Sequence, residues 1–329
     1  MSRTLRLLSY FLPLLALVVI VLGAFVRLSD AGLGCPDWPG CYGRLTVPSG
    51  VADIHLQHPD WYSRPLEPGK AWREMIHRYL ASALGLGIVI LAAACTRSRL
   101  RRAVGASAVV FLLVPLVMFQ GLLGMWTVTL LLKPLVVSAH LLGGLATLGL
   151  LWWNLLRVRG EPALAVTDGG LYPMARVAVG VLVLQIFLGG WTSANYAALA
   201  CTDFPTCQGS WWPRTDFRQA YVLWRGLGIN YEFGVLDTPA RTAIHVGHRF
   251  GALVATLTVG ITALLAWRSG QPRLRRLASC ILAALVLQVC LGITNVLAGL
   301  PLPVAVAHNG VAALLLLSLI TLVHSTRRL

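Results

Sequence analysis

The sequence predicts an all-α integral membrane protein whose eight transmembrane helices form two tandem four-helix bundles. Three observations predict this fold class: the composition, the apolar runs and an internal repeat. Hydrophobic residues make up 57% of the 329 residues and charged residues only 12%, whereas soluble domains are about a quarter charged. The chain is therefore expected to lie in a lipid bilayer.

Eight apolar runs are long enough to cross a bilayer, whose hydrocarbon core of about 30 Å takes about 20 helical residues. In chain order they are residues 8–28, 74–95, 104–130, 134–156, 173–195, 240–267, 275–298 and 303–324. The first run resembles a signal peptide, but no small-residue cleavage site follows it, so we count it as the first span.

A repeat relates the two halves of the chain. Shifts of 166 to 171 residues align two cysteines of an outer loop, a His-Arg pair and a later histidine with their counterparts. The aligned pairs are Cys35 and Cys201, Cys41 and Cys207, His77 and His248, Arg78 and Arg249, and His140 and His308. We therefore predict two halves, 1–160 and 161–329, with the same orientation and a pseudo-twofold axis along the membrane normal.

The basic residues are distributed asymmetrically. The N-terminus, the C-terminus and the segments 97–102, 157–176 and 268–276 hold 15 of the 27 Lys and Arg and two acidic residues, a charge of +13. The remaining 12 basic and ten acidic residues give +2. This positive-inside pattern predicts a multi-pass protein of the bacterial inner membrane with cytoplasmic termini and periplasmic long loops. The net positive charge is therefore explained by basic residues on the cytoplasmic side of the lipid membrane, and we expect no nucleic-acid partner.

The outer loops 29–73 and 196–239 are long and rich in Trp, Pro and Gly, so we expect function beneath them. Their tryptophans form either a lid or an interfacial belt. Each loop carries a Cys-x5-Cys pair, and the outside of the membrane permits disulfides. We expect Cys35 to pair with Cys41 and Cys201 with Cys207, either to shape a cap or to serve redox chemistry.

Four histidines lie at similar depth near the outer ends of the even-numbered spans: His77, His140, His248 and His308. Each repeat-related pair is able to clamp a haem between two imidazoles from neighbouring helices. Zinc fits less well, because the spans offer no carboxylate or thiolate set that completes four ligands there.

Other polar residues accompany the histidines. Arg78 and Arg249 either pair with haem propionates or extend to the membrane interface. A glutamine precedes a glycine by four residues at three places, Gln120, Gln185 and Gln288. The glycine allows two helices to pack closely, and the glutamine either helps this packing or donates a hydrogen bond to the neighbouring helix.

On these residues the chain resembles the haem A synthase family over essentially its whole length. The motifs are the segment from Gly34 to Cys41, Glu74-x-x-His77-Arg78, His140, His248-Arg249 and His308. The resemblance implies oxidation of the methyl group of haem O to a formyl group, by successive hydroxylations and loss of water, for cytochrome oxidase.

The resemblance also implies a division of labour. It places a haem b cofactor in the C-terminal half, at His248 and His308, and the substrate haem O at His77 and His140. Haem O synthase and an electron donor are the expected partners, and a homo-oligomer stays open. His245 takes no role from the family, and its position beside His248 leaves the cofactor ligand open between the two.

The halves differ where Glu74 stands opposite His245, three residues before the helix histidine. A carboxylate on the same helix face as His77 is suited to acid-base chemistry, so we expect Glu74 to be catalytic. Its alternative role is to stabilise a helix N-terminus. Two rival functions remain: a b-type dihaem electron-transfer protein, which needs no such carboxylate, and a non-catalytic haem carrier.

Overall fold

The computed structural model describes residues 3–50, 65–96, 108–161, 164 and 170–327. Apart from two isolated β-bridges, these residues form helices, turns and loops, and eight of the helices are long and apolar enough to cross a membrane. The spanning helices are α1 (Arg3–Leu28), α2 (Pro68–Thr96), α4 (Ala108–Thr129), α5 (Pro134–Val158), α6 (Leu171–Ala194), α8 (Thr238–Arg268), α9 (Pro272–Leu297) and α10 (Leu302–Thr326). The predicted fold class is confirmed.

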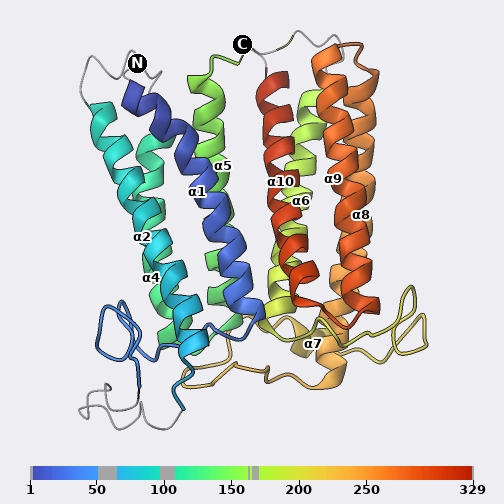
Figure 1. The fold of residues 1–329 in the computed structure, drawn as a ribbon. Helices are drawn as coiled ribbons and strands as arrows, with labels where there is room; N and C mark the ends of the chain where they lie inside the picture. Colours follow the sequence, from blue (N-terminus) through green and yellow to red (C-terminus); the bar gives the residue numbers. More distant parts are fainter. Residues whose placement is uncertain (1–2, 51–64, 97–107, 162–163, 165–169, 328–329) are drawn as a thin grey trace.

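Each half of the chain closes into a ring of four helices. In the first, α1 packs on α2, α2 on α4, α4 on α5, and α5 returns to α1. In the second, α6, α8, α9 and α10 close in the same way. The halves join where α1 and α5 meet α10 and where α5 meets α6 (Figure 1). Helices α2 and α5 are therefore diagonal in the first ring, as α8 and α10 are in the second.

Helix α1 begins and α10 ends at one face of the bundle, and both long loops lie at the other (Figure 1). This arrangement agrees with the expected placement of both termini on one side. The basic segment 97–102 and residues 51–64 of the first long loop lie outside the described residues. The short helix α7 (Phe217–Ala220) lies in the second long loop.

The second span begins six residues earlier than expected, at Pro68 rather than at residue 74. Proline is favoured at the first position of a helix, because the amide proton it lacks would have no helical partner there. Glu74 and His77 therefore lie in the second and third turns of α2 instead of at its start.

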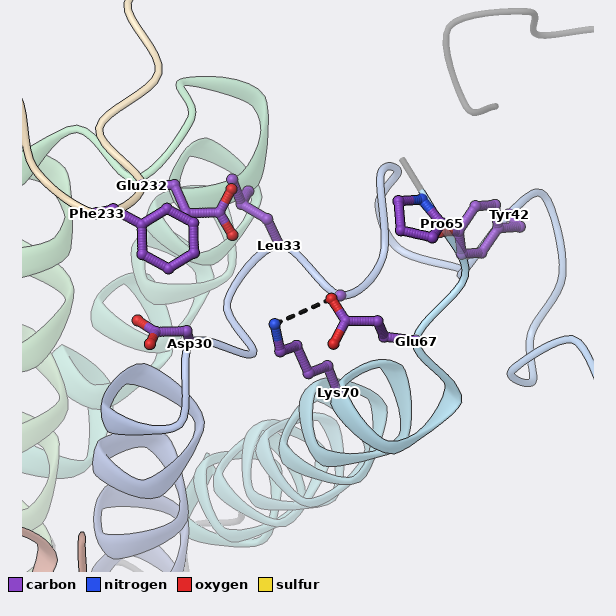
Figure 2. A pocket seen from close by; sticks show the side chains of 9 residues that line it. Asp30, Leu33, Tyr42, Pro65, Glu67, Lys70, Glu232 and Phe233 are labelled. Atoms are coloured by element: carbon purple, nitrogen blue, oxygen red, sulfur yellow. Dashed lines mark hydrogen bonds and ion pairs between the residues drawn. The ribbon is translucent and has the colours of Figure 1, made fainter. Parts of the chain in front are cut away.

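The outer loops bind the two halves together. Arg27 of α1 donates to the carbonyl of Ser193 at 2.5 Å, and the Tyr196 hydroxyl donates to Asp30 at 2.9 Å. A cavity of about 240 Å³ lies close by, where the start of α2 meets the second long loop. Figure 2 shows Glu67 and Lys70 of the first half on one side of it and Phe233 of the second half on the other.

Candidate functional site

The four predicted histidines lie on the diagonal helices of the two bundles. His77 of α2 and His140 of α5 meet in the first bundle, with ring centroids 6.5 Å apart and ring planes at 82°. His248 and His308 occupy the corresponding helices α8 and α10. The expectation that each pair comes from neighbouring helices is therefore wrong. Diagonal placement directs both imidazoles of a pair toward the centre of a bundle.

A glycine faces every one of these imidazoles. A Cβ atom on Gly23 would lie 2.9 Å from Cε1 of His77, and one on Gly124 would lie 3.5 Å from Cε1 of His140. In the second bundle, Gly189 and Gly292 would each bring a Cβ atom to 3.1 Å from Cε1 of His248 and His308. The glycines belong to α1, α4, α6 and α9, the other diagonal of each ring. Because glycine has only a hydrogen atom where other residues have a side chain, each imidazole has space beside it.

The first pair has the separation that a shared iron requires. Two metal–nitrogen bonds of roughly 2.0 Å, with about 1.2 Å from each ring nitrogen to its centroid, place the centroids of two axial imidazoles roughly 6.4 Å apart. The observed 6.5 Å agrees with this distance. The Nδ1 atoms of His77 and His140 are buried and have no hydrogen-bond partner. Buried polar groups are normally paired, so the first bundle fits a haem.

The second pair carries amide partners. Nε2 of Gln185 lies 3.0 Å from Nδ1 of His248 and 3.1 Å from the carbonyl oxygen of the same residue. Nε2 of Gln288 lies 3.2 Å from Nε2 of His308, whose Nδ1 is buried without a partner. The outer partner of a metal-ligating imidazole accepts the proton of its free ring nitrogen. The side-chain amide oxygens of Gln185 and Gln288 are buried without a partner and are acceptors available for that role, so the second bundle also fits a haem.

The glutamines thus do more than help the helices to pack. Gln120, the counterpart of Gln288, lies against Gly143 of α5, and its Nε2 is buried without a partner. The counterpart of Gln185 in the first half is Val19, which carries no polar group. Each glutamine precedes its glycine by one helical turn, and this spacing was the sequence signal for the glycines that face His140, His248 and His308.

The first outer loop closes over the bundle around a disulfide between Cys35 and Cys41. The carboxylate of Asp37 accepts hydrogen bonds from the amides of Tyr42 and Gly43 at 2.6 and 2.9 Å. Arg78, one residue after the helix histidine, donates to the carbonyl groups of Asp37 and Gly40 at 2.9 and 2.5 Å. The loop is therefore fastened to α2 beside His77.

Glu74 belongs to the same fastening. One carboxylate oxygen accepts the amide of Cys35 at 2.9 Å, and the other binds the guanidinium of Arg78 at 2.5 Å. The residue is only 5% exposed. Its position in the second turn, with both oxygens engaged, differs from that of a carboxylate stabilising a helix N-terminus.

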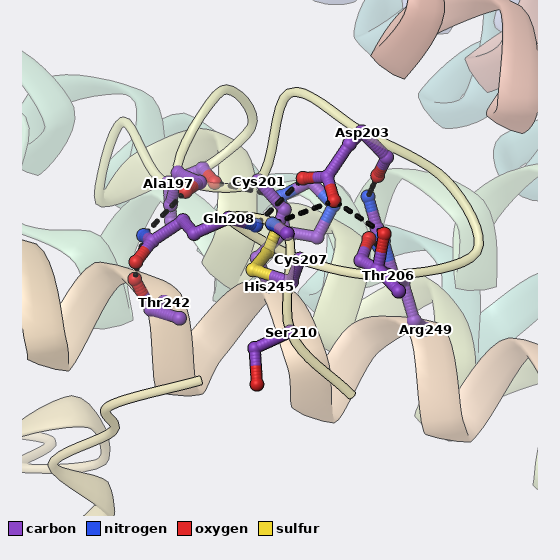
Figure 3. The surroundings of a disulfide bond; sticks show 12 residues. Ala197, Cys201, Asp203, Thr206, Cys207, Gln208, Ser210, Thr242, His245 and Arg249 are labelled. Carbon is purple, nitrogen blue, oxygen red and sulfur yellow. Dashed lines mark hydrogen bonds between the residues drawn. A yellow bond between two sulfur atoms is a disulfide. The ribbon is translucent and has the colours of Figure 1, made fainter. Parts of the chain in front are cut away.

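The second outer loop repeats this construction, as Figure 3 shows. Cys201 and Cys207 form a disulfide, so both disulfides form within a loop, as predicted. Asp203 accepts the amides of Gln208 and Gly209, and Arg249 donates to the carbonyl groups of Asp203 and Thr206, at 2.7 Å each. Hydrogen bonds from the Thr206 hydroxyl and the Gly209 amide lower the pKa of Asp203, which keeps this carboxylate charged at neutral pH.

His245 takes the place of Glu74 in the second half but bonds differently. Its Nδ1 lies 3.0 Å from the carbonyl oxygen of Ala197, and the side chain is buried. Because a carbonyl only accepts, Nδ1 carries the proton. His245 therefore holds the loop through a donor where Glu74 holds it through acceptors, and His248 is the histidine that faces Gly189.

Arg78 and Arg249 carry a role that sequence reasoning missed. Both were expected to reach either haem propionates or the membrane interface, and both bind the carbonyl groups of a disulfide loop. The sequence signal was available, since each follows a helix histidine and each loop has its own cysteine pair. Contact with propionates stays a prediction.

Comparison with known proteins shows the family to which the chain belongs. Residues 6–320 match the model of the cytochrome oxidase assembly protein family, COX15-CtaA. The chain is 46% identical to the haem A synthase of Shewanella oneidensis, over 93% of this chain and 92% of the relative. It is 30% identical to that of Paracoccus denitrificans, over 92% and 82%, and 27% identical to that of Granulibacter bethesdensis, over 97% and 86%. The chain belongs to the cytochrome oxidase assembly protein family that includes the haem A synthases.

Proposed function

We propose that this protein is a haem A synthase, which oxidises the methyl group of haem O to the formyl group of haem A. The observation that carries the proposal is the occurrence of two histidine pairs, one per bundle, each facing glycines. The separation of His77 and His140 suits a shared iron, and their Nδ1 atoms have no other partner. Family membership and the identity to curated haem A synthases support the same reaction.

His248 and His308 are the residues that would hold haem b, the cofactor, in the C-terminal half. When bound, haem b supplies one-electron redox chemistry. Each imidazole has a glutamine amide beside it, Gln185 at Nδ1 of His248 and Gln288 at Nε2 of His308. Of these two glutamines, the first bundle has a counterpart only in Gln120.

His77 and His140 bind the iron of haem O in the N-terminal half and so fix the orientation of its ring. Gly23 and Gly124 keep both imidazoles free of side-chain crowding. The Nδ1 atoms of both imidazoles are buried without a hydrogen-bond partner, as is Nδ1 of His308 in the second half.

Glu74 is the proposed acid-base group of the substrate half. Oxidation of a methyl group releases protons, and a buried carboxylate one turn before His77 is placed to accept them. Its contacts to Cys35 and Arg78 join this carboxylate to the outer loop. Through the same contacts Glu74 holds the first disulfide loop over the substrate.

The protein is further proposed to lie in the bacterial inner membrane with both termini in the cytoplasm, receiving haem O from haem O synthase and electrons from a donor. The charge split of +13 against +2 supports this orientation. A single cysteine placed at residue 100 of a variant without other cysteines should resist a membrane-impermeant thiol reagent in intact cells. Labelling from outside would contradict the orientation.

The test of function is pigment extraction from protein purified after co-expression with haem O synthase. Haem A or a hydroxylated haem O, together with haem b, is the expected result. The matched variant His77→Ala should keep haem b and lose the oxidised haem, because only the substrate pair is damaged. Haem b alone from the unmodified protein would instead indicate an electron-transfer protein.

A further inference from the structure

An apolar cavity of about 310 Å³ lies at the outer end of α4 and α5. Its walls include Leu123 and Trp126 of α4, Val136 and Ala139 of α5, and Trp224 of the second long loop. Every residue that lines it has an apolar side chain or an indole ring. The cavity thus suits a hydrocarbon rather than a charged or strongly polar ligand.

The cavity adjoins the histidine pair of the first bundle. Ala139 directly precedes His140, and Leu123 directly precedes Gly124, the glycine that faces the His140 imidazole at 3.5 Å. One wall of the cavity is therefore one residue from the iron ligand on α5, and the opposite wall is one residue from its glycine on α4. His140 and Gly124 do not themselves line the cavity, so it lies next to the backbone of α4 and α5 at the depth of the histidine pair.

The cover of the cavity comes from the other half of the chain. The ammonium group of Lys133, in the turn between α4 and α5, lies 3.9 Å from the centroid of the Trp224 ring and donates to the carbonyl of Gly226. The amide of Tyr231 donates to the carbonyl of Leu131 at 3.0 Å. These contacts hold Trp224 in place over the first bundle.

The repeat gives the second half a different surface at the corresponding place. A shift of 168 residues puts Thr294 opposite Trp126 and Ala298 opposite Leu130, a further residue of the cavity wall. A hydroxyl and a methyl group thus stand where the first half has an indole and an isobutyl group. Leu123, Val136 and Ala139 have identical counterparts in the second half, so of these five residues only the two large ones, Trp126 and Leu130, differ between the halves.

We propose that this cavity holds the isoprenoid chain of the substrate, an inference that rests on the proposed function. Haem O differs from protohaem by a long hydroxyethylfarnesyl chain, which is pure hydrocarbon beyond its hydroxyl group. A cavity of roughly 150 Å³ holds a benzene ring, so about 310 Å³ has room for on the order of a dozen carbons. The cavity fixes the rotation of the haem about its axial bonds and thereby selects which methyl group is oxidised.

The test compares two haems on the purified protein with haem b already bound. Difference absorbance gives the dissociation constants of haem O and of protohaem, which lacks the chain. We expect haem O to bind at least about tenfold more tightly, because only haem O has a chain whose burial in the cavity adds to the free energy of binding. Equal constants in the unmodified protein would overturn the proposal and assign the cavity to a membrane lipid.

Two variants localise the effect. Val136→Phe fills the cavity from α5 and Leu130→Trp fills it from the turn, and either should bring the two dissociation constants to within about twofold by weakening haem O alone. Leu122→Phe is the matched control, because Leu122 lies on α4 next to Leu123 but is 45% exposed and outside the cavity. A full preference for haem O in both filled variants would also overturn the proposal.

The same titration separates this inference from the function on which it rests. One outcome is that both haems bind equally well and that His140→Ala abolishes the binding of both. This outcome would support the substrate site and contradict only the role of the cavity in binding the chain. Haem binding that survives His140→Ala, or no binding of either haem to the unmodified protein, would contradict the proposed function and this inference with it.

Discussion

The two halves of the molecule share a scaffold but differ around their histidines. Both have a disulfide loop of equal length, an aspartate that binds two loop amides and an arginine that fastens the loop to its helix. In the second half, an amide of Gln185 lies 3.0 Å from Nδ1 of His248 and an amide of Gln288 lies 3.2 Å from Nε2 of His308. The Nδ1 atoms of His77 and His140 are buried without a partner, as is Nδ1 of His308. The repeated scaffold therefore keeps the loop and its fastening in both halves, while the polar neighbours of the histidines differ between them.

The largest effect that tests this comparison is the removal of a histidine. His248→Ala or His308→Ala should abolish the low-spin spectrum of haem b, because each leaves the iron with one protein ligand. His140→Ala should leave that spectrum intact and abolish haem A formation. Absorbance and electron paramagnetic resonance spectra of the purified variants, with extracted pigments, give both results.

His245→Gln is the matched control for these variants, since an amide keeps a donor for the Ala197 carbonyl. It should retain the low-spin spectrum. If the spectrum survives His248→Ala but is lost in His245→Gln, the cofactor ligand is His245, and the correspondence between the two halves is broken.

Glu74→Gln should reduce haem A formation by about a hundredfold or more, the usual contribution of acid-base catalysis, while haem b and the expression level stay normal. The amide oxygen of glutamine still accepts the Cys35 amide, so the loop keeps one of its two contacts. Haem A per haem b in extracted membranes is the measurement.

Arg78→Gln separates chemistry from positioning, because it removes the ion pair and leaves the Glu74 carboxylate in place. We expect a smaller loss than in Glu74→Gln. Equal losses in the two variants would reduce Glu74 to a residue that positions the loop, and wild-type amounts of haem A from Glu74→Gln would remove it from the mechanism.

Gln185→Val gives the second half the residue that Val19 supplies in the first. This exchange removes both contacts of the amide with His248, to Nδ1 and to the carbonyl oxygen. Since a hydrogen bond contributes about 1 kcal/mol, haem b retention should fall by at least about fivefold. Dialysis against apomyoglobin, followed by absorbance, measures the retention. Val19→Gln is the reverse exchange and should not weaken haem b. Unchanged retention in Gln185→Val would mean that the amide does not orient His248.

The smallest contrast is expected between the disulfides. Replacing Cys35 and Cys41 by serine, or Cys201 and Cys207 by serine, should each lower the free energy of unfolding by about 2 kcal/mol, because both close loops of the same length. Thermal unfolding followed by pigment absorbance compares the two double variants. A loss of haem A formation in only one of them, without a stability difference, would indicate a redox role for that loop.

The sequence sufficed for the helices, the four histidines and the disulfide pairing, because apolar periodicity, the repeat and short cysteine spacing are local signals. It did not reveal the diagonal arrangement that puts His77 opposite His140. That arrangement depends on the packing of α5 against α1, which closes the ring of four helices. Nor did it reveal the hold of Lys133 on Trp224, since contacts between distant loops leave no periodic pattern. The early start of α2 at Pro68 was missed because polar residues there mask the helix.

The contacts that cross between the halves bear on how this chain can be divided. Arg27 of the first half donates to the carbonyl of Ser193, and Asp30 accepts from the hydroxyl of Tyr196. Separating the halves would leave these polar groups at the outer surface without their partners. A gene split between residues 161 and 170 would therefore need both fragments in the same membrane to rebuild the protein.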